Sequence, residues 1–313
     1  MTKAWIIAGT VTAQLVLVLH GQESAPKDVV PIYSVTVVER GVDAVNYQYR
    51  SAPTKIDFRG TVLLPPAKGQ AIVESRQGRA EIDAKFENLT APSRFGAGYL
   101  TYVLWAISPE GAAHNLGEII TDASDRARLR ATTDLQAFGL IVTAEPYASV
   151  RQPSSVVTLE NKIRPDTAGK IEPVRAKEGL LTRPPYTLQI DASSQSAATG
   201  RPKVSMDQYE ALLELYQAQN AVSIARAAEA DRLAPGAFAN AVKALNEAQR
   251  LQQTKANTKL VVQAAREATQ TAEDARSIAE SHKHAEQPSQ SEQSAPSAIS
   301  QGARSNPPAL PTQ

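Results

Sequence analysis

The chain has 313 residues, a formal net charge of +1 and a hydrophobic content of 42%, so it has room for two ordinary domains with buried cores. The near-neutral charge and the lack of a stripe of basic and aromatic residues argue against nucleic acid as a partner. The sequence holds no cysteine, which excludes disulfides, thiol catalysis, cysteine-ligated metal sites and a lipoprotein anchor.

Residues 1–21 have the composition of a signal peptide. Lys3 supplies a short basic start, and residues 4–19 are mostly apolar but shorter than the ~20 residues that a membrane-spanning helix needs. Gly21 and Ala25 are small enough to serve as cleavage points. We therefore expect export, with an uncleaved membrane anchor or a buried element of a cytoplasmic protein as the alternatives.

Residues 29–160 alternate short β-like runs with turn residues. The clearest run is residues 79–89, in which three apolar residues alternate with charged ones: Ile82, Ala84 and Phe86. About nine such runs at short spacing, with no helical period between them, are typical of a sandwich. The pattern predicts an antiparallel β-sandwich of the Ig-like kind.

The centre of this predicted sandwich is the aromatic, β-branched run at residues 99–107. With a period of two, one face holds Tyr99, Thr101, Val103, Trp105 and Ile107, and the other holds Leu100, Tyr102, Leu104 and Ala106. Both faces are mostly apolar, which predicts a central strand that is covered on both sides. A turn follows at residues 108–111, and residues 114–121 and 137–144 are expected to complete the antiparallel core.

Residues 161–204 lose this pattern and contain scattered prolines among charged and small residues. Such a composition buries too little apolar surface to offset its ordering entropy, so it predicts a linker. We also consider one further strand within this linker, near residues 186–190.

Residues 205–285 are rich in alanine and have a helical period. Ser205 and Gln208 match a capping box at the start, and Pro235 suits the first turn of a second helix. The predicted apolar stripes are Tyr209, Leu212, Leu213, Tyr216 and Ile224; then Phe238, Val242, Leu245 and Ala248; then Val261, Ala264, Ala268, Ala272, Ala275 and Ile278.

A polar break at residues 254–259 separates the second stripe from the third. The sequence thus predicts an antiparallel bundle of three helices with coiled-coil-like packing. A bent hairpin with a continuous second helix is the alternative. Residues 286–313 have the composition of a disordered tail.

The helical part resembles an uncharacterised family of Ala-rich helical domains of the bacterial envelope. The resemblance rests on Ala221, Ala225, Arg226, Ala227, Ala230, Ala234, Pro235, Phe238, Ala241, Leu245 and Ala248. Members of that family often stand just before an OmpA-like peptidoglycan-binding domain, which implies an envelope location. In this chain the polar tail stands at that place, so direct contact with peptidoglycan is not implied.

The β part is similar to the extracytoplasmic β-sandwich of anti-sigma-K-type factors. The similarity lies in residues 99–105, in Pro109, Glu110 and Gly111, and in Leu116 and Gly117. It implies the sandwich fold and does not extend to a sigma-binding domain.

Tyr102 and Trp105 are the candidate binding surface, because aromatic side chains can line a groove for a sugar or a peptide. Core packing is the competing interpretation. We expect no catalytic, cofactor-binding or metal-binding residues, since no phosphate loop, dinucleotide turn or nucleophile elbow is present.

The other polar residues have simpler interpretations. His114 is expected to be an exposed histidine beside a turn, and the i, i+2 spacing of His282 and His284 does not suit joint metal ligation. The carboxylates Asp57, Glu81, Asp83 and Glu87 alternate as on a solvated strand face. A solvated helical face, or else a protein-docking surface, is expected for Arg226, Arg232, Arg250, Arg266, Arg276, Glu229, Glu247, Glu267 and Glu273.

The sequence therefore favours a non-enzymatic exported protein of the periplasm or outer membrane, with a tethering or protein-binding role. Its expected partner is an envelope protein or cell-wall component, and the bundle is expected to allow oligomers. The alternatives are a carbohydrate- or ligand-binding sandwich and a regulator held in the inner membrane by its N-terminal segment.

Overall fold

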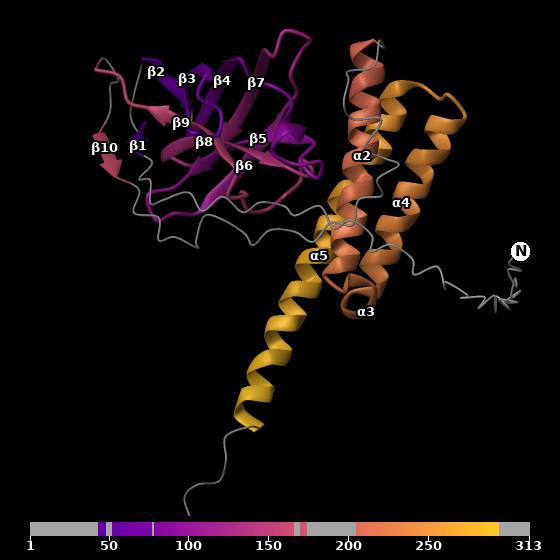
Figure 1. The fold of residues 1–313 in the computed structure, drawn as a ribbon. Helices are drawn as coiled ribbons and strands as arrows, with labels where there is room; N and C mark the ends of the chain where they lie inside the picture. Colours follow the sequence, from indigo (N-terminus) through magenta and orange to yellow (C-terminus); the bar gives the residue numbers. More distant parts are fainter. Residues whose placement is uncertain (1–42, 48–51, 77, 166–169, 174–204, 294–313) are drawn as a thin grey trace, which may run out of the picture.

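The structure is a computed structural model that describes residues 43–47, 52–76, 78–165, 170–173 and 205–293. An antiparallel β domain comes first, and a region of helices follows and lies beside it (Figure 1). The predicted succession of an all-β part and an all-α part is thus confirmed. The predicted signal peptide and most of the predicted tail lie outside the described residues.

The β domain is a ten-stranded sheet in which every pairing is antiparallel. Its strands are β1 (Asp43–Asn46), β2 (Thr54–Gly60), β3 (Lys68–Arg76), β4 (Arg79–Glu87), β5 (Thr101–Ile107), β6 (Ala113–Ile119), β7 (Ala127–Thr133), β8 (Ala137–Glu145), β9 (Val157–Lys162) and β10 (Lys170–Pro173). A short 3₁₀ helix, η1 (Pro92–Phe95), precedes β5.

The sheet curls into a near-barrel. The hydrogen-bonded order runs β6-β5-β8-β9-β2-β3-β4-β7, and β1 and β10 extend it beside β8. β6 and β7, at the two ends of this path, lie next to each other without a ladder between their described residues. The hydrophobic interior of the near-barrel therefore has strands on almost every side.

In strands with one solvent-exposed face, buried and exposed residues alternate as predicted. In β4, Ile82, Ala84 and Phe86 are buried, whereas the residues between them are exposed or half-buried. β5 is instead buried at every position, as predicted for a strand covered on both sides. Tyr102 and Leu104 belong to the interior of the near-barrel.

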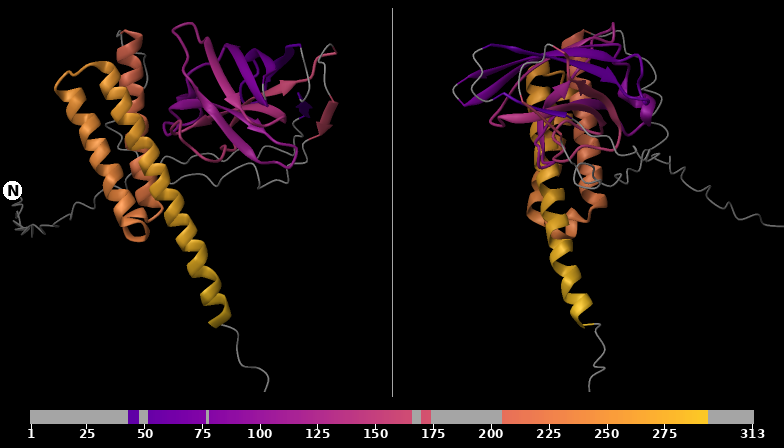
Figure 2. Two further views of the ribbon diagram at one scale, coloured as in Figure 1. Left: turned by 180° about the vertical axis from the view of Figure 1, so that it is seen from behind. Right: turned by 90° about the vertical axis from the view of Figure 1, so that its left-hand side faces the viewer.

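The second cover of β5 is the helical region. Val103, Trp105 and Ile107 point away from the interior and share a hydrophobic core with helical residues such as Ile224 and Ala275. The β domain lies against the helices in all three views (Figures 1 and 2). The sequence predicted two units joined by a linker, but here they pack on each other through one continuous core.

The predicted linker contains some structure. β9 continues to Lys162, and β10 pairs with β1 within the range 161–204. The rest of that range, including the strand considered near residues 186–190, lies outside the described residues.

The helical region has four helices, α2 (Met206–Ala227), α3 (Ala230–Leu233), α4 (Pro235–Gln253) and α5 (Thr258–Gln293). The capping box at Ser205 is confirmed, and Pro235 opens α4 as predicted. The polar break near residue 254 is also present, since α4 and α5 are separate helices. The one-turn α3, which follows Glu229 in the left-handed conformation, was not predicted.

α5 packs against both α2 and α4 and is the longest helix. It ends at Gln293, beyond the predicted boundary at residue 285, and its C-terminal part runs past α3 (Figures 1 and 2).

The predicted apolar stripe of α2 is wrong at four of its five positions. Ile224 is buried, but Tyr209, Leu212 and Leu213 are only half-buried and Tyr216 is exposed. Alanine takes four of the buried positions, Ala211, Ala218, Ala221 and Ala225, beside Leu215, Val222 and the polar Glu214 and Gln217. Alanines let helix axes approach closely, so this seam favours small side chains over most of the larger apolar ones.

The stripes of α4 and α5 are closer to the prediction. Phe238, Ala248, Val261, Ala268, Ala272 and Ala275 are buried. Ile278 is exposed instead, and Val242, Leu245 and Ala264 are half-buried against the core. Among the described residues of α4 and α5, the exposed large apolar side chains are Leu260 and Ile278, which lie 18 residues apart on α5.

Candidate functional site

The most distinctive polar region lies at the junction between the β domain and the helices. A groove of about 890 Å³ opens there, between β6, the loop after β8, α2 and α5. It is lined by Ala113, His114, Asn115, Gly117, Glu118, Ile120, Ala148, Ser149, Val150, Arg151, Glu214, Arg266, Thr269 and Gln270. Two clusters of buried polar side chains hold this junction together.

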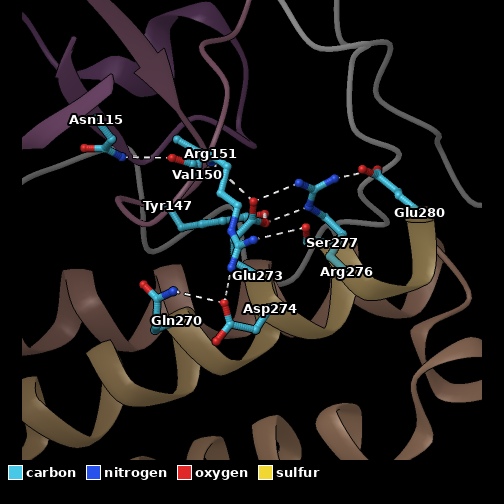
Figure 3. Close-up of polar contacts among 10 residues, drawn as sticks. All are labelled: Asn115, Tyr147, Val150, Arg151, Gln270, Glu273, Asp274, Arg276, Ser277 and Glu280. Atoms are coloured by element: carbon cyan, nitrogen blue, oxygen red, sulfur yellow. Dashed lines mark hydrogen bonds and ion pairs between the residues drawn. The ribbon is translucent and has the colours of Figure 1, made fainter. Parts of the chain in front are cut away.

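The first cluster is centred on Glu273 of α5, whose side chain is fully buried (Figure 3). The Tyr147 hydroxyl donates to Oε2 of Glu273 at 2.7 Å, and the backbone N–H of Arg151 donates to Oε1 at 3.3 Å. Arg276 binds the same carboxylate with two nitrogens, at 2.6 and 2.8 Å. A buried carboxylate needs several donors to offset the loss of water, and Glu273 obtains them from both parts of the protein.

The loop after β8 brings Tyr147 and Arg151 to α5. Arg151 extends its guanidinium to Asp274 and to Ser277 Oγ, the latter at 3.2 Å (Figure 3). Asn115 of β6 donates its amide hydrogens to the carbonyls of Ala148 and Val150, at 2.8 and 2.9 Å. The loop is therefore fixed to the β domain on one side and to α5 on the other.

The second cluster joins β6 to α2. Oε1 of Glu118 accepts hydrogen bonds from Thr101 Oγ1 at 2.6 Å and from Gln217 Nε2 at 2.5 Å. Gln217 in turn accepts from the backbone N–H of Ala148 at 2.6 Å. Thus one glutamine of α2 ties together a strand and the loop after β8.

Glu214, one turn before Gln217 on α2, is only 1% exposed. Its Oε1 accepts from Arg266 Nε at 2.6 Å, and the same guanidinium reaches Glu210 at 2.8 Å. Burial first, and the nearby negative charge of Glu118 second, raise the pKa of Glu214 to about 8, although Arg266 opposes both effects. Glu214 can therefore hold a proton near neutral pH and donate it in a hydrogen bond to Glu118.

The structure places the two predicted binding residues on opposite faces of β5. Tyr102 is 1% exposed, points into the near-barrel and donates to the Thr90 carbonyl at 2.7 Å. Trp105 is 0% exposed, faces the helices and donates through Nε1 to Thr143 Oγ1 at 2.8 Å. Their opposite faces agree with the sequence pattern, and the burial of both side chains agrees with core packing, the competing interpretation.

The histidines and strand carboxylates lie largely where the sequence placed them. His114 is exposed on β6, although it lines the groove. On the outer face of the β domain, Asp83 pairs with Arg128 and Arg130, and Asp57 pairs with Arg164. Within the part of the chain that the structure describes, no group of three or more His, Cys, Asp or Glu side chains is arranged to hold a metal ion.

Sequence reasoning assigned Glu273 and Arg276 to a solvated face, and it did not single out Tyr147, Glu118 or Glu214. Glu273 follows Ala272 directly in the small-residue stripe of α5, and Thr269, four residues earlier, is also buried. A carboxylate next to a stripe of alanines was the signal that could have pointed to a buried role.

None of the helices in the described part of the chain is long and apolar enough to cross a membrane. Comparison with protein-family models finds no matching family, and comparison with curated proteins finds no match either. The two family resemblances noted above therefore stay predictions.

Proposed function

We propose that this protein is a non-enzymatic, exported component of a bacterial cell envelope, in which it has a structural, tethering or protein-binding role. The location rests on the signal-peptide composition of residues 1–21. The expected place is the periplasm or the outer membrane, and the expected partner is an envelope protein or a cell-wall component.

The observation that carries the role is the packed junction between the two parts of the protein. The outer face of β5 and β8 shares a hydrophobic core with α2 and α5, and two buried polar clusters join the same elements. Such an interface holds the β domain at a fixed position relative to the helices. A body of this kind is suited to holding two envelope components at a set distance, one on the β domain and one on the helices.

The finer architecture belongs to this proposal as well. We infer that the near-barrel is a variant of the Ig-like sandwich and that α2, α4 and α5 act as a bundle of three long helices. Contacts of α5 with both other long helices support the second inference. The ligand-binding alternative at Tyr102 and Trp105 gains no support, because neither side chain reaches the surface.

The experiment is to express the full chain in a Gram-negative host, fractionate the cells and measure the intact mass of the protein in each fraction. The proposal predicts a mass that lacks the first ~21–25 residues, found in the periplasmic or outer-membrane fraction. As a control, Leu15→Arg with Leu17→Arg interrupts the apolar run and should keep the full-length chain in the cytosol.

A full-length mass in the cytosol for the unmodified chain would overturn the proposal. A full-length mass in the inner membrane would favour the anchored regulator instead. If export is found, chemical crosslinking in intact cells followed by mass spectrometry identifies the envelope partner.

A further inference from the structure

The carboxyl pair of Glu118 and Glu214 lies at a point where three elements meet. Glu118 belongs to β6, Glu214 belongs to α2, and their common neighbour Arg266 belongs to α5. Glu214 is buried, and Glu118 is held by Thr101 and Gln217. Any change in the charge of this pair therefore acts directly on the contact between the β domain and α2.

The charges around the pair do not balance when both carboxyls are ionised. Arg266 is the cation in direct contact with Glu214, and it is shared with Glu210 on the same helix. Of the other charged groups that line the groove, Arg151 is paired with Asp274. His114 is exposed on β6 and lies at the groove as well. The carboxylates of Glu118, Glu210 and Glu214 thus compete for the guanidinium of Arg266, and that of Glu214 is buried.

A proton removes this imbalance. When Glu214 is protonated, its hydroxyl can donate to Glu118, and Arg266 then has one fewer buried charge to neutralise. The pKa of Glu214 is raised, first by burial and second by the charge of Glu118, and this upward shift agrees with the geometry.

We propose that the Glu118–Glu214 pair is a proton-operated latch, which joins β6 to α2 while it holds a proton and loosens the β domain from the helices when the proton is lost. Gln217 of α2 also bridges Glu118 to the N–H of Ala148, so a separation of β6 from α2 breaks this bridge as well.

The direction of the pH dependence follows from linkage. In the docked state Glu214 has a pKa of about 8, against 4.5 for a glutamate in solvent. Docking raises the pKa of Glu214, so protonation of Glu214 stabilises the docked state. This stabilisation is complete at any pH below the pKa of the solvated side chain, and it is lost as the pH rises through the pKa of the docked state. The latch is therefore closed in mildly acidic solution and open in alkaline solution.

Trp105 provides a reporter for this test, because it is buried between the β domain and the helices. The chain has one other tryptophan, so a Trp5→Phe background leaves Trp105 as the sole indole. Quenching of its fluorescence by acrylamide, an uncharged quencher, is measured on the full chain from about pH 5.5 to about pH 9.5, with circular dichroism at each pH. We expect quenching to rise several-fold across this range while the helical and strand signals stay constant.

Glu214→Gln mimics the protonated side chain and should abolish the rise. Glu210→Gln is the matched control, because Glu210 also contacts Arg266 but lies at the edge of the cluster. It should keep the pH profile of the parent. Glu118→Gln removes the neighbouring charge and should move the midpoint of the rise to lower pH.

A flat profile in the parent, or the same rise in the Glu214→Gln variant, would overturn the proposal. If Glu214→Gln does not fold, the midpoint of Glu118→Gln decides, because an unchanged midpoint contradicts a shared proton. The latch does not rest on the proposed function, since it concerns the junction wherever the protein is located.

Discussion

The hydroxyl of Tyr147 on the β domain donates a 2.7 Å hydrogen bond to the buried carboxylate of Glu273 on α5, 126 residues further along the chain. Arg276, three residues after Glu273, closes the other side of that carboxylate with two nitrogens. This contact fixes the loop after β8 onto α5. It joins the two parts of the protein into one body in the structure.

Removing the carboxylate should strongly destabilise the protein. Glu273→Ala takes from the buried Arg276 the carboxylate that binds two of its nitrogens, although Arg276 keeps its pair with Glu280, and it removes the hydrogen bond that the Tyr147 hydroxyl donates to Glu273 (Figure 3). Loss of one member of a buried ion pair costs about 3–5 kcal/mol. Urea unfolding of the variant, compared with the parent, measures this change in the free energy of unfolding.

A matched control exists on the neighbouring helix α4. Glu247 and Arg250 form an ion pair with the same i, i+3 spacing, but it lies exposed on α4. Glu247→Ala should therefore leave the free energy of unfolding unchanged within error. Equal effects of the two substitutions would contradict a buried role for Glu273.

Removing only the hydroxyl of Tyr147 should have a smaller effect. Tyr147→Phe keeps the ring in place and takes one donor from Glu273, which retains Arg276 and the Arg151 N–H. The loss of one hydrogen bond to a buried charge costs about 1.5–3 kcal/mol. In the Glu273→Ala background the same substitution should cost clearly less, and additive effects in this double-mutant cycle would show that the two residues are not coupled.

Trp105 should behave as a core residue. Trp105→Ala removes the largest fully buried side chain of the β domain and should cost about 3–5 kcal/mol of unfolding free energy. Val62→Ala, at a residue that is 69% exposed, is the control and should change stability little. A Trp105→Ala protein with parental stability would instead reopen the ligand-binding role of this tryptophan.

The alanine seam of α5 should not accept larger side chains. Ala275 is fully buried in the core that the β domain shares with the helices, so Ala275→Leu forces neighbouring side chains apart. Overpacking of this kind costs about 1–3 kcal/mol. Ala285→Leu, at an exposed position of the same helix, should be close to neutral, and thermal unfolding of the two variants gives the comparison.

Much of the fold was predictable because it depends on local patterns. The alternation in β4, the cap at Ser205 and the proline that opens α4 each act within a few residues, and each is confirmed. The two-sided burial of β5 was also predicted from its apolar faces. What covers the second face could not be read locally, because α2 and α5 lie more than a hundred residues away in the sequence.

The site depended even more on such distant contacts. Glu214 and Glu118 are unremarkable in the sequence, and their proximity arises only when α2 docks on β6. The predicted apolar stripe of α2 failed for a second reason. Hydrophobic periodicity weighs side-chain size, whereas the close packing of three helices selected alanine for the seam and left Tyr216 outside.

The central claim is that the β domain and the helices form one body, and a distance measurement between them tests it most directly. The chain contains no cysteine, so Val62→Cys and Lys243→Cys introduce a single pair of spin labels at exposed sites, one in each part. Pulsed electron–electron double resonance at mildly acidic pH then gives the distribution of label distances. One narrow distribution is the predicted result. A broad distribution, as expected for two parts joined only by a flexible linker, would contradict the account.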